Sequence, residues 1–376
     1  MTPTLLYINT IQFGYHIGSY RILQNLKEDF EITYICFDYS YKRIEQPGIL
    51  VKYVPWEGSY FSKGKRFMKS CLNLIKSKQA DIIIAGYFPF VSLFKILSAK
   101  QNIILDIRTG SVSRSRINRY IINNLIRLDT QFFKKVTIVS ESLADKLKLK
   151  SSKVHILPLG ADITSTKNKS YNKLHLFYIG TLNGRNVHES IYGLKIFLEQ
   201  FNGDRREVTY DIFGEGNDEY TKLVRKAILD TGLQEQIVVH GRREHSELEA
   251  YFDNCNVGVS YVPITEFYEC QPPTKTFEYV NAGMVCIATE TKENKKLINS
   301  ENGVLCRDNP LSFCKALTSI YNNRNKWDSE RIRNTLSDYT WDNIAEGLRY
   351  FLLEKEETMM INSPDLIVKP KGVDKE

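Results

Sequence analysis

The sequence contains no hydrophobic run long enough to cross a membrane. Its longest nearly uncharged stretch, residues 82–94, includes Gly86 and Pro89 and is shorter than the about 20 apolar residues that a membrane-spanning helix needs. The first ten residues show no basic leader before their apolar run and no small-residue cleavage site after it, so we expect no secretory signal. These absences predict a cytoplasmic protein.

Several patterns that define common enzyme sites are also missing. The seven cysteines form no Cys-x-x-Cys pair and several lie inside apolar runs, which predicts reduced, buried thiols rather than disulfides or a zinc site. No Asp-x-Asp, His-x-x-x-His or Gly-x-Ser-x-Gly motif occurs, so nothing supports metal-bridged diphosphate binding, zinc hydrolysis or an α/β-hydrolase nucleophile. The absence of Gly-x-Gly-x-x-Gly disfavours a nicotinamide enzyme. We expect neither a metal nor a cofactor.

Length and composition indicate a globular protein with two domains. The chain has 376 residues, more than twice the ~150 that usually form one domain. With 42% hydrophobic and 25% charged residues, it is neither a disordered chain nor a coiled coil. No short-period repeat is visible, which excludes solenoids and propellers.

Short β-branched or aromatic runs alternate with segments of helical length, which is the pattern of parallel βαβ units. A first series predicts strands at residues 5–8, 31–37, 50–55, 81–85, 102–107, 135–139 and 153–157. A second series predicts strands at residues 174–179, 208–213, 237–240, 257–260 and 285–289, with helices centred near 196, 224, 248, 277 and 317. The sequence therefore predicts an α/β fold with two Rossmann-like, doubly wound parallel-sheet domains.

The domain boundaries follow from changes in composition. We expect an N-terminal domain over residues 1–160 and a C-terminal domain over 174–340, separated by a polar, small-residue linker over 161–173. A helix should follow over 341–357. The tail over 358–376 contains proline, glycine and charge with little to bury, so we expect it to be disordered.

Positive charge is concentrated in residues 51–150, which carry 19 basic and 6 acidic side chains. Basic and apolar residues interleave there at helical spacing over 63–78 and again over 114–135, which predicts two basic amphipathic helices. Ordinary solvated helices, docking on an anionic membrane and nucleic-acid binding all fit such charge. Because no recognised nucleic-acid module is present, we expect no nucleic-acid partner and keep the membrane surface as the alternative to solvated helices.

The most informative segment is residues 271–289. Thr274 is a good N-cap residue after two prolines, and Gly283 is a good residue to end a helix before an apolar strand. A helix that begins near Lys275 offers unpaired N–H groups, a positive dipole end and a full charge, which suit a diphosphate. Glu278 shares a helical face with Lys275 and suits ribose hydroxyls, although this spacing also fits a plain surface ion pair.

The stretch Pro273-x-Lys275-x-x-Glu278-Tyr279-x-x-Ala282-Gly283 resembles the donor-site segment of GT-B glycosyltransferases, in particular the large retaining family (glycosyltransferase family 4, group 1 type) of bacterial polysaccharide and glycolipid synthesis. The likeness covers most of residues 130–290. Its other motifs are the interdomain segment 157–162, Tyr178-Ile179-Gly180-Thr181-Leu182 followed by Arg185, Phe213-Gly214-Glu215-Gly216, His240-Gly241 and Val257-Gly258-Val259-Ser260.

The resemblance implies a GT-B fold and a nucleotide-diphosphate sugar, of the UDP or GDP type, as co-substrate rather than cofactor. It also implies retention of the anomeric configuration. Lys275, Arg185 and the helix end would stabilise the departing diphosphate without a metal, and Glu269 would reach the donor sugar. The predicted donor-binding residues are Gly14, Gly180, Thr181, Gly214, Gly216, Thr274, Lys275 and Glu278.

Two positions depart from the family pattern. The family commonly has an arginine directly after the glycine where this chain has Thr181, which leaves Arg185 as the basic group of that loop. The family's first glutamate lies eight residues before the second, but that position is Cys270 here. Glu269 lies nine residues before Glu278 and reaches the sugar only if its loop bulges by one residue.

The predicted N-terminal domain holds two further candidate segments. Gly14 and Gly18 follow the first strand, and glycines there let backbone N–H groups approach a phosphate. His16 between them is either a turn residue or a group on the acceptor side. Arg108 follows another strand at its carboxyl end, where open α/β sheets bind ligands. It either contacts the acceptor or a phosphate, or pairs with Asp106.

The sequence therefore predicts a glycosyltransferase that moves a sugar from a nucleotide-diphosphate sugar to a glycan or lipid-linked acceptor. The basic helices suggest an acceptor at the inner face of the plasma membrane, where the protein would be peripheral. Two alternatives stay open: a catalytically silent GT-B-like partner subunit, and a sugar-nucleotide epimerase with the same two-domain plan.

Overall fold

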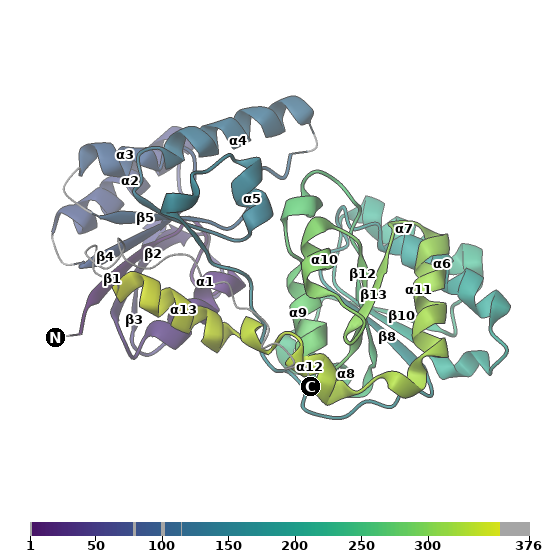
Figure 1. Cartoon of the computed structure of the whole chain (residues 1–376). Coiled ribbons are helices and arrows are strands. Elements are labelled where there is room, and N and C mark those ends of the chain that lie inside the picture. The colour runs from purple at the N-terminus through teal and green to yellow at the C-terminus, as the bar shows by residue number, and fades with distance from the viewer. Residues whose placement is uncertain (1, 78–79, 99–101, 114, 354–376) are drawn as a thin grey trace. The chain divides into compact units, whose positions relative to one another are not determined.

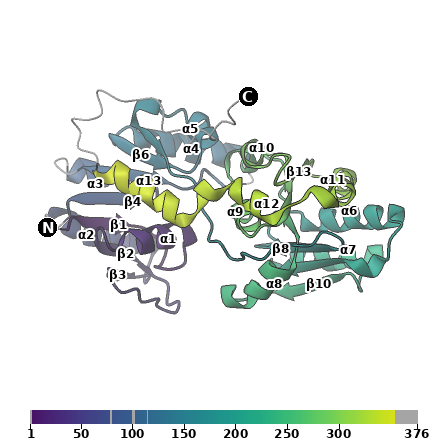
Figure 2. The same ribbon diagram turned by 60° about the horizontal axis from the view of Figure 1, so that its bottom comes forward.

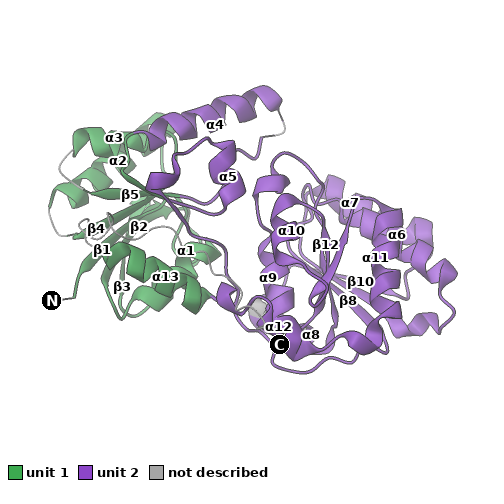
Figure 3. Cartoon of the chain, in the orientation of Figure 1, with its two compact units in different colours: residues 1–106, 132–136, 341–376 green, residues 107–131, 137–340 purple. Residues whose placement is uncertain are grey.

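The computed structural model of the chain describes residues 2–77, 80–98, 102–113 and 115–353 (Figure 1). The described residues form two compact units (Figure 3). Unit 1 contains residues 1–106, 132–136 and 341–376, and unit 2 contains residues 107–131 and 137–340. The predicted tail over 358–376 lies outside the described residues.

The first sheet has seven strands in the order β3-β2-β1-β4-β5-β6-β7. Its strands are β1 (Thr4–Ile8), β2 (Glu31–Asp38), β3 (Ile49–Pro55), β4 (Ile82–Gly86), β5 (Ile103–Ile107), β6 (Lys135–Ile138) and β7 (Val154–Ile156). Pairing is parallel, with Thr4 opposite Glu31 and Leu5 opposite Ile82. The connecting helices are α1 (Ile17–Leu26), α2 (Tyr60–Lys76), α3 (Ser92–Leu97), α4 (Arg116–Thr130) and α5 (Glu141–Lys146). Both predicted basic segments are thus helical, as α2 and α4.

The second sheet has six parallel strands in the order β10-β9-β8-β11-β12-β13. They are β8 (Leu174–Ile179), β9 (Val208–Phe213), β10 (Ile237–Gly241), β11 (Val257–Ser260), β12 (Val285–Thr289) and β13 (Gly303–Cys306). Its helices are α6 (Val187–Gln200), α7 (Asp218–Thr231), α8 (Glu249–Asn254), α9 (Thr274–Asn281), α10 (Lys292–Leu297), α11 (Pro310–Asn322) and α12 (Ser329–Asn334). The prediction of two doubly wound parallel sheets is confirmed.

The strands of both sheets are apolar along most of their length because helices cover both faces of a parallel sheet and leave few strand positions exposed to solvent. Every residue of β5 and of β12 is buried. All seven cysteines are free and buried, as predicted. Among the described residues, no helix has both the length and the apolar character needed to cross a membrane.

The last described helix, α13 (Trp341–Leu353), returns to unit 1, where it packs against α1 (Figure 2). Leu348 is 1% exposed, and the Arg349 guanidinium lies 4.0 Å from the carboxylate of Asp29. The C-terminal segment is therefore part of the unit that the N-terminal strands build.

Candidate functional site

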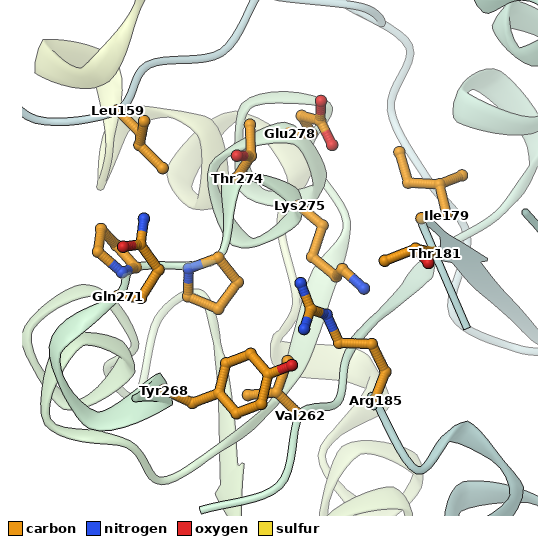
Figure 4. Close-up of a pocket in the computed structure, with 13 residues that line it drawn as sticks. Leu159, Ile179, Thr181, Arg185, Val262, Tyr268, Gln271, Thr274, Lys275 and Glu278 are labelled. Carbon is orange, nitrogen blue, oxygen red and sulfur yellow. The ribbon is translucent and has the colours of Figure 1, made fainter. Parts of the chain in front are cut away.

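A pocket of about 360 Å³ lies in unit 2 beside the first turn of α9 (Figure 4). Its other walls come from the ends of β8 and β11, which are the two strands where the sheet order reverses. Open α/β sheets bind ligands at this switch point. Its lining residues are Leu159, Ile179, Gly180, Thr181, Arg185, Val262, Tyr268, Gln271, Pro272, Pro273, Thr274, Lys275 and Glu278.

Helix α9 begins at Thr274, with Pro273 rather than Thr274 in the N-cap position. The proline ring fixes φ, and the observed φ of −76° with ψ of 123° ends the extended segment one residue earlier than predicted. Within the part of the chain that the structure describes, no side chain caps this helix end. The N–H of Thr276 in the first turn donates to the Pro273 carbonyl at 3.1 Å. The N–H groups of Thr274 and Lys275 therefore remain suited to an anionic ligand.

Lys275 is 8% exposed, and its Nζ has no hydrogen-bond partner among the residues that the structure describes. The Nζ lies 3.8 Å from the centroid of the Tyr178 ring, a cation–π contact. Burial, together with the nearby positive charge of Arg185, holds the pKa of the Lys275 ammonium well below its usual value. A surface ion pair with Glu278 is thus not what the structure shows, and the two side chains point apart in Figure 4.

Arg185 reaches the same pocket from the loop between β8 and α6. Its guanidinium carbon lies 4.6 Å from the centroid of the Tyr268 ring. The Tyr268 hydroxyl donates to the Gly184 carbonyl at 3.1 Å, which ties the ring to the arginine's own loop. The pocket thus holds two cations that rest on aromatic rings, a lysine on Tyr178 and an arginine on Tyr268.

Glu278 lines the pocket one helical turn after Lys275. Burial raises the pKa of its carboxyl to about 7, and the positive charge of Lys275 opposes that rise. A carboxylate in this position can accept hydrogen bonds from the hydroxyls of a bound ribose when it is ionised.

The glycines of the predicted donor loops give the pocket its shape. Gly180 has a φ of +132°, and a Cβ there would lie 3.3 Å from the Nζ of Lys275. Gly214 also has a φ of +132°, and a Cβ there would lie 1.8 Å from the Gly180 carbonyl oxygen. Gly214 and Gly216 do not line the pocket. They support the 180–183 turn from behind, since a Cβ on Gly216 would lie 3.0 Å from that of Leu182.

Thr181 lines the pocket but turns its hydroxyl toward the neighbouring loop, where it donates to the Glu215 carbonyl at 3.2 Å. Glu269 is not among the lining residues. Its Oε2 accepts the N–H of Lys292 at 2.8 Å, at the start of α10. The same loop sends Tyr268 and Gln271 into the pocket instead.

Three of the predicted site residues, Arg108, Gly14 and His16, are not among the residues that line this pocket. Arg108 donates to the carbonyls of Leu157 at 2.7 Å and Pro158 at 3.2 Å, next to the pocket residue Leu159. Gly14 and His16 belong to unit 1, whereas the pocket residues belong to unit 2. A Cβ on Gly14 would lie 2.2 Å from Cδ1 of Ile44, and the His16 Nδ1 accepts the Ser19 N–H at 3.2 Å to cap α1.

Sequence reasoning missed the contributions of Tyr268, Gln271 and the Tyr178 ring. Tyr178 stood in a recognised motif, but nothing in that motif indicates a ring beneath Lys275. Tyr268 lies 83 positions after Arg185, so no local spacing connects them.

Comparison with known proteins bears on the family of the C-terminal segment and on the fold. Residues 173–323 match the family model of group 1 glycosyl transferases. Sucrose-phosphate synthase from Thermosynechococcus elongatus has a similar structure, with a TM-score of 0.72 and 14% identity over 93% of this chain and 98% of that one. Anabaena HepE in complex with UDP and glucose has a TM-score of 0.69 and 13% identity, over 93% and 99% of the two chains. No curated protein matches the chain.

Another similar structure is the lipopolysaccharide outer core galactosyltransferase WaaB, with a TM-score of 0.66 and 12% identity over 92% of this chain and 98% of that one. The fold and the matched domain define the class of this protein: it is a glycosyltransferase enzyme with the GT-B fold. More particularly, the segment that carries α9 and the two cations of the pocket matches the group 1 glycosyl transferases, over residues 173–323.

Proposed function

We propose that the protein transfers a sugar from a UDP-sugar, or else from another nucleotide-diphosphate sugar such as the GDP type, to a glycan or lipid-linked acceptor. The observation that carries this proposal is the buried, unpartnered Nζ of Lys275, which shares a pocket with Arg185 at the first turn of α9. Positive charge that is buried without a carboxylate partner suits an anionic ligand. UDP is the first candidate because HepE was solved with UDP-glucose.

The proposed chemistry is electrostatic. The bond from the sugar to the diphosphate breaks with the electron pair on the diphosphate, and the charge that develops there lies beside Lys275, Arg185 and the N–H groups of α9. These groups supply positive charge without a divalent metal. By resemblance to the retaining family, the departing diphosphate assists removal of the acceptor's proton, and the product retains the anomeric configuration.

We place the acceptor near a membrane because of α2. Its exposed side carries Phe61, Lys65, Lys69 and Lys76, the mixture of an aromatic ring and lysines that binds anionic lipid headgroups. Two further basic residues of the predicted helix, Lys63 and Arg66, make contacts within the protein. The Nζ of Lys63 lies 4.0 Å from the ring of Trp56, and Arg66 donates to the Pro55 carbonyl at 2.9 Å. Peripheral attachment would serve a lipid-linked acceptor in polysaccharide or glycolipid assembly.

Thermal unfolding with UDP, GDP, ADP and CMP tests the donor site. A ligand at 100 times its Kd adds about 2.7 kcal/mol of stability, so we expect one nucleoside diphosphate to raise the Tm by several degrees. Lys275→Ala/Glu278→Ala should lose that shift. The matching nucleotide sugar then identifies the donor, and NMR of the product's anomeric proton determines whether configuration is retained.

Two results would contradict the proposal. If no nucleotide shifts the Tm of the wild type, the silent partner subunit becomes the better interpretation. If the nucleotide sugar is consumed without acceptor and yields an isomeric nucleotide sugar, the protein is an epimerase.

A further inference from the structure

A row of aromatic side chains lies in unit 1, at the carboxyl ends of β1, β2 and β3. Its members, which we call the aromatic row, are Tyr15, Tyr41, Tyr39, Trp56 and Tyr60. Successive ring centroids are 4.8, 5.7, 5.0 and 6.1 Å apart. Four of the rings come from three connecting segments, each of which follows a different strand, and Tyr60 is the first residue of α2.

The aromatic row is open to solvent rather than part of the core. Tyr15 is 40% exposed, Tyr41 is 52% exposed and Tyr60 is 84% exposed, while Tyr39 and Trp56 are partly buried. A contiguous aromatic surface on a folded unit marks an interaction site. Its position also fits, because the carboxyl edge of a parallel sheet is where ligands bind.

Buried contacts hold the row in place before any ligand arrives. The Gln12 side chain is fully buried; its Oε1 accepts the Tyr39 N–H at 2.9 Å and its Nε2 donates to the Tyr41 carbonyl at 2.9 Å. Ser40 between the two tyrosines has a φ of +61°. The Lys63 cation lies over Trp56. A ligand that binds to side chains already held in place loses little binding free energy to ordering them.

The rings of the aromatic row carry hydroxyl groups or lie near charged side chains. Four of the five rings are tyrosines, and the fifth, Trp56, has the Lys63 ammonium over it. The Tyr15 hydroxyl donates to the Lys42 carbonyl at 3.1 Å. Beside Tyr41, Arg43 pairs with Asp38 at 2.7 Å. A pyranose ring needs this combination, because its C–H face is apolar and packs on aromatic rings while its equatorial hydroxyls seek polar partners.

We propose that the aromatic row binds a saccharide segment of the acceptor, with pyranose rings packed on the exposed rings of Tyr15 and Tyr41 and beside the partly exposed Tyr39 and Trp56. This inference rests on the proposed function, because a glycosyltransferase needs an acceptor, and it names the chemical class that this acceptor must contain. A purely lipid acceptor, without sugars, would not need the row.

The test uses the full chain labelled with 5-fluorotryptophan. The protein has three tryptophans, so ¹⁹F NMR gives a short spectrum in which Trp56→Phe identifies the Trp56 signal. The probes are hexasaccharides of α-glucan, β-glucan, chitin, mannan and galactan. We expect at least one of them to move the Trp56 signal in a saturable way and to leave the Trp327 signal unchanged.

Variants then assign the binding surface. Tyr41→Ala should weaken binding of that hexasaccharide about tenfold, the effect of losing one stacked ring, and Tyr41→Phe should retain most of it. Tyr350→Ala is the matched control, since Tyr350 is a 56% exposed tyrosine of the same unit that lies outside the row. An unchanged Tm shows that each variant is folded.

The proposal falls if no hexasaccharide moves the Trp56 signal, or if Tyr41→Ala binds as tightly as the wild type. It also falls if vesicles of phosphatidylcholine and phosphatidylglycerol perturb that signal while saccharides do not, because the row would then contact a membrane. The outcome of the UDP experiment is independent of the outcome of the saccharide experiment. A Tm shift with UDP and no saccharide binding removes this inference alone, whereas saccharide binding without any nucleotide shift removes the proposed function.

Discussion

At the scale of single residues, the proposed donor pocket differs from a site of ion pairs, because aromatic rings hold its cations. Arg185 rests on the ring of Tyr268 and Lys275 on that of Tyr178. A carboxylate partner would neutralise each cation and compete with a diphosphate, whereas an aromatic face orients the cation and leaves its charge available. We therefore expect Tyr268 to act as a positioning residue, through Arg185, and not to contact the reacting atoms.

Tyr268→Leu should weaken UDP binding by about 0.5–2 kcal/mol, the range of cation–π contacts. Binding of uridine, which has no phosphates, should not change. Tyr268→Phe keeps the ring and loses only the hydrogen bond to Gly184, so it should restore most of the affinity. Isothermal titration with UDP and ligand-observed NMR with uridine provide the readouts. Equal losses for UDP and uridine would instead indicate a collapsed pocket.

Lys275 should take up a proton when UDP binds. Burial and Arg185 lower its pKa in the empty pocket, and the negative diphosphate raises that pKa again in the complex. A group whose pKa rises on binding favours the complex at lower pH, so UDP affinity should fall as pH rises through the pKa of the bound state.

The measurement is isothermal titration at pH 8 in buffers of different ionisation enthalpy. At this pH Glu278, with a pKa of about 7, is mostly ionised in the empty pocket. Proton uptake should be positive for the wild type and absent in Lys275→Met. Equal uptake by both proteins would assign the proton to another group.

At the scale of elements, we propose that α9 and α2 bind different ligands. Helix α9 presents an uncapped first turn to the pocket, and α2 presents Lys65, Lys69 and Lys76 to solvent. The first arrangement suits a compact anion and the second a diffuse anionic surface.

Replacing Lys65, Lys69 and Lys76 of α2 by glutamine should reduce binding to phosphatidylglycerol vesicles by an order of magnitude or more, since each basic residue near such a surface contributes about 1 kcal/mol. Vesicle sedimentation at low and high salt measures this. The matched control is Lys222→Gln/Arg225→Gln/Lys226→Gln on α7, whose side chains are also exposed. Binding that ignores both salt and the α2 changes would exclude α2 as the docking helix.

At the scale of the whole molecule, the chain ends in the unit where it began. Helix α13 packs on α1 within unit 1, so this unit's stability depends on residues more than 300 positions after its first strands. A truncation before Trp341 would expose the face of α1 that α13 covers.

Leu348→Ala should destabilise the protein by about 2–5 kcal/mol, the usual cost of emptying a buried leucine site, because Leu348 is 1% exposed. Leu353→Ala at the 44% exposed end of the same helix should have little effect. Chemical denaturation compares the two. The stabilisation by UDP should persist in both variants, since the pocket residues lie in unit 2.

The sequence by itself determined the fold class and the start of the helix on which the proposed donor site is built. Alternating apolar runs defined two parallel sheets, since covered strands must be apolar along their length, and the turn, helix and strand signals around Lys275 placed a helix start within one residue of its observed position. These features depend on neighbours in the sequence, so local patterns were enough.

Only the tertiary structure decided which side chains share the pocket. It directed Glu269 to the start of α10 and Tyr268 to Arg185, although the two residues are adjacent in the chain. It also packed Gly14 against Ile44 and returned α13 to α1. Side-chain direction in an irregular loop, and contacts between segments far apart in sequence, depend on how the elements pack, and no local spacing encodes that packing.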